Sequence, residues 1–344
     1  MKIKKRLLFP LAVFLLVAWP ICIGYTEALW DEQNGRITGN IPTKDGYEIT
    51  LDIPVPTKIF DESFPVYTVK NRKIHFEAFQ NLFNQFANLH GQAELAVPST
   101  FVDEESSSRR QYFCCNRLGK VGWQISTPVY AIPKSLIPES DEQIQIVRQI
   151  LDALSIEYET PFYYAVRGIE DIGNLSITNY VRETDSIYII RQCIDHFPIT
   201  SGSVYHHGVE YYGCNSSVIL DQDNDLVYLS TINLVDVRPS GKEKTCISWE
   251  EAMSAFVKGK QDLKSELTGS IPLDGKLKTS RLLIDSLSPS LIVNDQNKRL
   301  IPMWEFDADV EIQWTDAEGV DHVNYRIKRY YVNAWTAEYY SWDP

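Results

Sequence analysis

The sequence has no cluster of basic residues after its first few positions, and this absence bears on its partners. Its 344 residues carry 33 Lys and Arg against 46 Asp and Glu, which gives a formal net charge of −13. Proteins that bind nucleic acid neutralise the phosphates with clustered Lys and Arg. We therefore expect no nucleic-acid partner.

The short motifs that mark many enzymes and redox proteins are also missing. There is no Cys-x-x-Cys, no Gly-x-Ser-x-Gly, no P-loop and no Gly-x-Gly-x-x-Gly. These absences remove the usual sequence support for a zinc or thioredoxin-type site, for a serine hydrolase and for nucleotide binding. We expect no cofactor and find no catalytic set of residues.

Long apolar runs are absent except at the N-terminus. A basic segment at residues 2–6 precedes an apolar run from Leu7 to about Tyr25. This pattern predicts a signal peptide or an N-terminal membrane anchor at residues 1–28, with the body of the protein secreted or membrane-anchored outside the cytoplasm. Cys22 leaves lipidation open, although residues 19–21 make a poor lipobox. Without a second apolar run, a protein that crosses the membrane several times is excluded.

Five further cysteines follow Cys22, an odd number that leaves at least one thiol outside any internal pair. A short hairpin-like segment separates Cys193 from Cys214, so we predict a disulfide between these two. The adjacent Cys114 and Cys115 would point to opposite sides of a strand.

The body of the chain has ordinary globular composition, with 44% hydrophobic and 23% charged residues. Apolar residues recur at helical spacing over 74–89, 141–155 and 248–258. The last helix begins with Ser248 and has Glu251 three residues on, the spacing of a capping box. Strands are expected at 47–54, 111–129, 162–166, 186–194, 218–220, 226–231, 282–293, 299–312 and 324–340.

A helix followed by antiparallel strands thus occurs twice. We predict an α+β protein with two helix-plus-antiparallel-sheet domains in tandem, at 137–240 and 241–344. A smaller α+β unit at 29–136 precedes them. The polar segment 238–244 is interpreted as a linker.

Two clusters of possible metal ligands are assigned no metal. The acidic run 221–225 is followed by Leu226, where an EF-hand needs Gly, and Ile232 stands where it needs Glu, so a hairpin turn is predicted. In a strand, His206 and His207 would point to opposite faces, but Tyr205 and Gly208 beside them favour a loop, and no third ligand is suitably spaced.

Possible catalytic residues also have simpler explanations. Cys193 shares a segment with His196, but it continues an apolar strand pattern. The acid pair at 250–251 suits the first turn of a helix, and the acids at 307 and 309 suit a solvated strand face.

Aromatic residues concentrate near the C-terminus. They form either core and sheet-edge packing or a partner-binding face, for which Trp335, Tyr339, Tyr340 and Trp342 are the candidates. The terminal strand could also accept a partner's strand by β-augmentation.

Four segments together carry a family resemblance. They are Tyr188–Ile199, Ile247–Ala252, Leu300–Phe306 and Val332–Glu338. With them the chain resembles the PepSY-like secreted lipoproteins of Gram-positive bacteria, including uncharacterised lipoproteins of gut Firmicutes, and more distantly the extracytoplasmic regulators YycH and YycI. His196 and Ala337 stand where that pattern usually has Gly.

The resemblance implies an exported protein near the membrane that binds or regulates another envelope protein or a peptide, without catalytic residues. The alternative hypothesis is an exported hydrolase or a carbohydrate-binding protein of the cell surface.

Overall fold

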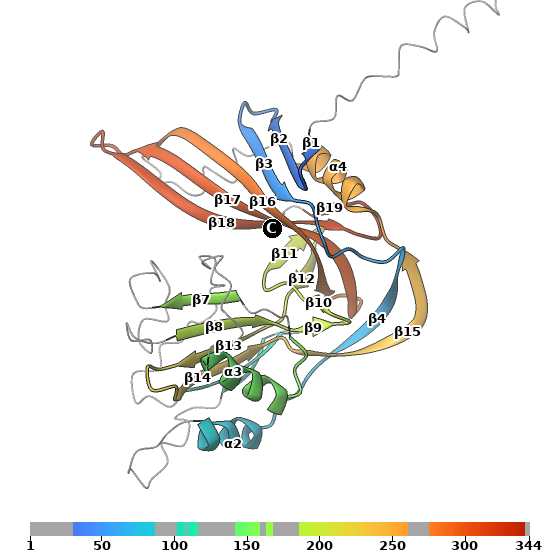
Figure 1. The fold of residues 1–344 in the computed structure, drawn as a ribbon, viewed down its shortest axis with the longest axis vertical. Coiled ribbons are helices and arrows are strands. Elements are labelled where there is room, and N and C mark those ends of the chain that lie inside the picture. The colour runs from blue at the N-terminus through green and yellow to red at the C-terminus, as the bar shows by residue number, and fades with distance from the viewer. Residues whose placement is uncertain are drawn as a thin grey trace, which may run out of the picture.

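The computed structural model describes residues 30–86, 102–106, 109–115, 142–158, 163–167, 186–260 and 275–340. Within these ranges the chain is a mixed α and β protein, mostly sheet with three helices, which confirms the expected class at this level (Figure 1). The predicted signal peptide or anchor at 1–28 lies outside the described residues, as does Trp342. None of the described helices combines the length and hydropathy needed to span a bilayer.

The larger of two main sheets has eleven strands, and its central path runs β1-β2-β3-β16-β17-β18-β19. Its strands are β1 (Asp31–Gln33), β2 (Arg36–Pro42), β3 (Glu48–Pro54), β4 (Ser63–Asn71), β11 (Ser203–His206), β12 (Val209–Tyr212), β15 (Val235–Thr245), β16 (Lys276–Asn294), β17 (Arg299–Thr315), β18 (Asp321–Asn333) and β19 (Tyr339–Tyr340). All its pairs are antiparallel except β3 with β16.

The burial of β17 changes along its length. Residues 300–306 are buried on both faces, whereas from Asp307 onward buried and half-buried residues alternate. The first half has a core on each side: Trp304 packs in the larger core, and Met303 packs in a smaller core with the β11–β12 hairpin. The second half shows the period of two expected for one covered face.

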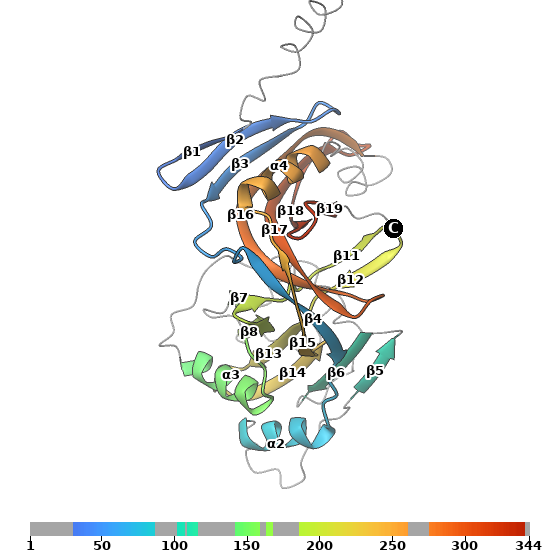
Figure 2. The same cartoon turned by 90° about the vertical axis from the view of Figure 1, so that its right-hand side faces the viewer.

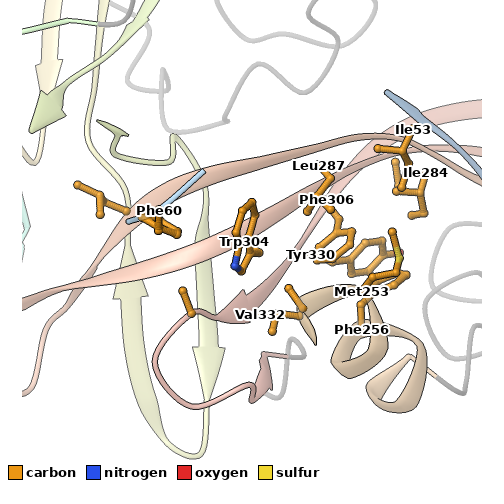
Figure 3. Close-up of a cluster of buried hydrophobic side chains, with 14 of the residues drawn as sticks. Ile53, Phe60, Met253, Phe256, Ile284, Leu287, Trp304, Phe306, Tyr330 and Val332 are labelled. Carbon is orange, nitrogen blue, oxygen red and sulfur yellow. The ribbon is translucent and has the colours of Figure 1, made fainter. Parts of the chain in front are cut away.

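Helix α4 (Trp249–Gly259) packs on one face of the larger sheet. Its capping box is confirmed: the Glu251 N–H donates to Ser248 Oγ at 3.3 Å, and the Ser248 N–H donates to Glu251 Oε2 at 2.9 Å. Its buried face presents Phe256, whose ring stacks on Phe306 with centroids 4.5 Å apart (Figure 3). Strands β1 to β3 extend the larger sheet beyond β16, and Figure 2 shows them beside α4.

The smaller sheet has six antiparallel strands in the order β5-β6-β14-β13-β8-β7. They are β5 (Val102–Ser106), β6 (Arg109–Cys115), β7 (Tyr163–Arg167), β8 (Ser186–Arg191), β13 (Asn215–Leu220) and β14 (Leu226–Ile232). Helices α2 (Phe76–Phe86) and α3 (Glu142–Ala153) share one core with this sheet (Figure 2). The short strands β9 (Cys193–Ile194) and β10 (Phe197–Pro198) pair only with each other.

In the described part of the predicted N-terminal unit at 29–136, the strands do not form a sheet of their own. Strands β1 to β4 belong to the larger sheet, and β5 and β6 belong to the smaller one. In particular, β3 lies parallel to β16, where Ile49 is opposite Leu282. The prediction assumed that consecutive elements are neighbours in space, which is a tendency rather than a rule.

Among the segments that connect the larger sheet with the smaller one, β4 and β15 pair with each other. Strand β4 leads from the larger sheet toward α2, β15 leads back toward α4, and the two run antiparallel (Figure 1). The interpretation of 238–244 as a linker was therefore wrong, because this segment belongs to β15. Residues 238–245 are all exposed, which explains the polar composition of this segment.

Candidate functional site

Trp335, Tyr339 and Tyr340, the three candidates for partner binding that the structure describes, pack mainly inside the protein. The side chain of Tyr339 lies against α4, since a Cβ added at Gly259 would meet the Tyr339 ring at 2.5 Å. Tyr340 is buried, its hydroxyl accepts from Asn333 Nδ2 at 2.8 Å, and burial raises its pKa. These contacts agree with the interpretation that Tyr339 and Tyr340 belong to core and sheet-edge packing.

Trp335 is half-buried and contacts one basic residue. Lys244 Nζ lies 4.7 Å from the centroid of the indole ring, a cation–π distance. The backbone N–H of Trp335 donates to Asn333 Oδ1 at 2.8 Å, which fixes the turn before β19. Trp335 therefore contributes to the packing of β15 against the C-terminal turn.

The predicted disulfide between Cys193 and Cys214 is not present. Cys214 is a buried free thiol whose Sγ donates to Asn233 O at 2.7 Å, and burial raises its pKa. Cys193 lies in β9, where it is opposite Pro198. Burial also raises the pKa of Cys246 to about 11, so this thiol is protonated at neutral pH.

A surface cluster forms where the β11–β12 hairpin meets the C-terminal turn. His207 and Gly208 make its two-residue loop, with φ of 50° and 74°, as a type I′ turn requires. The turn brings the ring of His207 back toward His206, with centroids 4.1 Å apart. The turn at His207 agrees with the predicted loop, and because His207 is not in extended conformation the two rings do not point to opposite faces of a strand.

A third side chain joins this histidine pair. Glu338 Oε1 lies 3.0 Å from His206 Nε2 and 3.4 Å from His207 Nε2. Glu338 is held by the turn after Asn333, whose N–H donates to Glu338 O at 2.8 Å. The contact joins positions 132 residues apart, so spacing along the chain gave no signal of it.

A charge network lies where the two sheets meet. Arg191 of the smaller sheet places Nη1 3.0 Å from Oε1 of Glu305 on β17. Arg329 of β18 places Nε 2.9 Å from Asp307 Oδ1 and 3.5 Å from Glu305 Oε1. The side chain of Glu305 is only 1% exposed. The network thus joins the smaller sheet to the larger one through ion pairs. Asp307 has a structural partner in Arg329, so its presence needs no catalytic role to explain it.

The outer edge of β18 is the third notable feature. Its whole length pairs with β17, but on the other side β19 covers only Tyr331 and Val332. Within the described part of the chain, residues 321–330 have no neighbouring strand on that side. At about 3.3 Å per residue this edge is about 33 Å long. Val320 and Val323, at its start, are 51% and 48% exposed.

The fold and these features define a two-sheet α and β protein with a charged junction between the sheets. No protein-family model matches the chain, and a search of curated proteins gives no match. Among solved structures it is similar to an uncharacterized protein from Eubacterium rectale, with a TM-score of 0.55 and 10% sequence identity. The similarity covers 89% of this chain and 93% of that one. At this identity it shows the fold alone.

Proposed function

We propose that this protein is a non-enzymatic binding or regulatory protein of the cell envelope, which holds an extended segment of another protein against β18. The observation that carries the proposal is the open edge at residues 321–330. An edge strand presents backbone N–H and C=O groups that lack partners in the sheet. A segment added there would extend the sheet by β-augmentation.

The two ends of the larger sheet differ in a way that supports this assignment. The opposite edge strand, β1, has only three residues, all exposed, which is a short edge of the kind that discourages pairing. The open part of β18 is ten residues long and begins beside two exposed valines. It is therefore the better template for a second strand.

The charge of β18 favours a particular occupant. The strand carries Arg326, Lys328 and Arg329 against the single acidic residue Asp321, in a chain whose net charge is −13. Arg329 already pairs with Asp307, and Asp321 already pairs with Lys278. An extended segment that contains acidic residues would complement it. If a second copy of this chain bound there through its own β18, two cationic strands would lie side by side. Repulsion between their like charges opposes this pairing.

The sequence and the fold support an extracytoplasmic setting and a family. The basic and apolar N-terminus supports export, with the chain secreted, anchored or lipidated at Cys22. Helix α3 with β7, β8, β13 and β14, and helix α4 with β16 to β18, support two PepSY-like domains in tandem. Between β8 and β13 the chain also forms β9 to β12, of which β11 and β12 join the larger sheet. On this proposal the N-terminal strands complete the two sheets, and the protein resembles regulators such as YycH and YycI.

The alternative of an exported hydrolase or carbohydrate-binding protein gains no specific support from the described residues. Two of the carboxylates that it would use have structural partners: Glu251 belongs to the capping box of α4, and Asp307 pairs with Arg329.

The test compares two substitutions of exposed apolar residues in the full chain. Val323→Asp places a negative charge on the open edge, and Ile59→Asp makes the same change at a site that is 56% exposed. After crosslinking in intact cells and mass spectrometry, we expect one envelope protein to be captured by the wild type and by Ile59→Asp, but not by Val323→Asp. Hydrogen exchange should slow at residues 321–330 in the complex.

Equal capture by both variants would contradict binding at β18. Capture of cell-wall glycans alone would favour the carbohydrate-binding alternative. A protein dimer of the wild type, abolished by Val323→Asp, would replace the foreign partner with a second copy.

A further inference from the structure

We propose that His206, His207 and Glu338 form a binding site for a divalent transition metal ion, with Zn²⁺ as the best match. The two histidines come from the β11–β12 hairpin and Glu338 comes from the turn before β19. Each offers one ligand atom, and these three atoms all lie within 4.8 Å of one another.

The distances fit a tetrahedral ion. Zinc ligands lie about 2.0–2.1 Å from the metal, which places neighbouring ligand atoms of a tetrahedron about 3.3 Å apart. Glu338 Oε1 is 3.0 Å from one imidazole nitrogen and 3.4 Å from the other. Small rotations of the exposed His207 and Glu338 side chains would bring the third pair of atoms to the same separation.

The ligand types select the class of metal. Two imidazoles and one carboxylate suit Zn²⁺ and related transition metals, whereas Ca²⁺ and Mg²⁺ prefer sites made of oxygen ligands. Three protein ligands leave a fourth position for water. The side chains of His207 and Glu338 are 73% and 44% exposed, so an ion can reach the site from solvent.

The ring of His206, and the backbone that carries His207 and Glu338, are held in place before any ion binds. The imidazole of His206 is 8% exposed and stacks on the ring of Tyr340, with centroids 4.3 Å apart. The tight turn at His207 and Gly208 fixes the backbone position from which the His207 imidazole extends. Hydrogen bonds from the N–H groups of Asn333 and Ala337 close the turn that carries Glu338. Such support lowers the entropy lost on binding.

One feature limits the affinity. His206 Nδ1 is buried and has no hydrogen-bond partner among the residues that the structure describes. When Nε2 binds a metal, Nδ1 carries the proton, and no acceptor stabilises it. Loss of an outer-shell partner weakens metal binding by about 10–100-fold. We therefore expect an exchangeable ion rather than one that stays bound through purification.

The ion would have a defined structural effect. It would tie the β11–β12 hairpin to the turn before β19, and β19 covers the end of β18 at Tyr331 and Val332. Metal binding would thus fix the point at which the open edge of β18 ends.

The test is calorimetric titration of the full chain with Zn²⁺, after treatment with a chelator. We expect one Zn²⁺ per chain, and a loss of affinity greater than about 100-fold in His207→Ala and Glu338→Gln, because each removes a ligand rather than an outer-shell partner. His322→Ala is the matched control: it breaks a different histidine–carboxylate pair, with His322 Nε2 2.8 Å from Asp316 Oδ2, and should bind as the wild type.

Two further measurements distinguish a metal-binding site from a cluster in which the three side chains only form hydrogen bonds with one another. Co²⁺ should give the intense visible absorption of a tetrahedral complex in the wild type and not in His207→Ala, while Ca²⁺ should not compete. The proposal is overturned if the wild type binds no Zn²⁺, or if His207→Ala binds it unchanged. Because His207 is largely exposed, this variant should fold, which circular dichroism without metal would check.

Discussion

Substitution of Arg191 by Met tests whether the charge network couples the two halves of the molecule. The change leaves the Glu305 carboxylate, 1% exposed, without its partner from the smaller sheet. Breaking a buried ion pair by removing one member costs about 3–5 kcal/mol. We expect the lower end, about 3 kcal/mol, because Arg329 Nε remains 3.5 Å from Glu305 Oε1.

The assay is urea unfolding followed by circular dichroism and tryptophan fluorescence. With an m-value of about 3 kcal/mol/M, a loss of about 3 kcal/mol lowers the midpoint by about 1 M. This conversion requires one cooperative transition, which coincident circular dichroism and fluorescence curves would show.

Two comparisons make the result specific. Arg36→Met removes an exposed pair, with side chains 47% and 51% exposed, and should cost at most about 1 kcal/mol. Adding Glu305→Gln to Arg191→Met removes the unpaired charge and should restore part of the stability. If Arg191→Met costs no more than Arg36→Met, the network does not couple the halves and this reasoning fails.

Three further predictions concern single elements. Gly259→Ala places a methyl group 2.5 Å from the Tyr339 ring, so we expect a loss of about 1–3 kcal/mol in thermal unfolding, and an unchanged melting temperature would show that Tyr339 moves away freely. Ser248→Ala removes the cap of α4 and should cost about 0.5–2 kcal/mol by the same assay, whereas no loss would mean that the capping box is not formed in solution. The hydrogen bond from His322 and those from two backbone N–H groups lower the pKa of Asp316, so they stabilise the β17–β18 turn above the unfolded pKa near 3.9, and this is lost as pH falls through the folded pKa. The protection factors of the amides in the turn, which correct for the intrinsic pH dependence of exchange, should therefore fall in acid, and in Asp316→Asn they should already be low at neutral pH. Protection factors that do not change with pH in the wild type would contradict this.

The sequence by itself determined the local elements, because their causes lie within a few residues. The capping box of α4 is present, and the helix predicted at 141–155 appears as α3 at Glu142–Ala153. The run 221–225 is the predicted hairpin turn, where Asp221 Oδ1 accepts from two backbone N–H groups. Each of these depends on periodicity, capping or turn chemistry, which the order of residues contains directly.

Only the tertiary structure decided how the strands combine and which side chains meet. The parallel pairing of β3 with β16 joins segments more than 200 residues apart, and it divides the expected N-terminal unit between two sheets. The packing of Cys214 against Asn233 excludes the expected disulfide. The meeting of His206, His207 and Glu338 depends on a left-handed residue in a hairpin loop and on a contact across 132 positions. The energy of such long-range contacts comes from burial and pairing in the folded chain, and local sequence patterns do not contain that information.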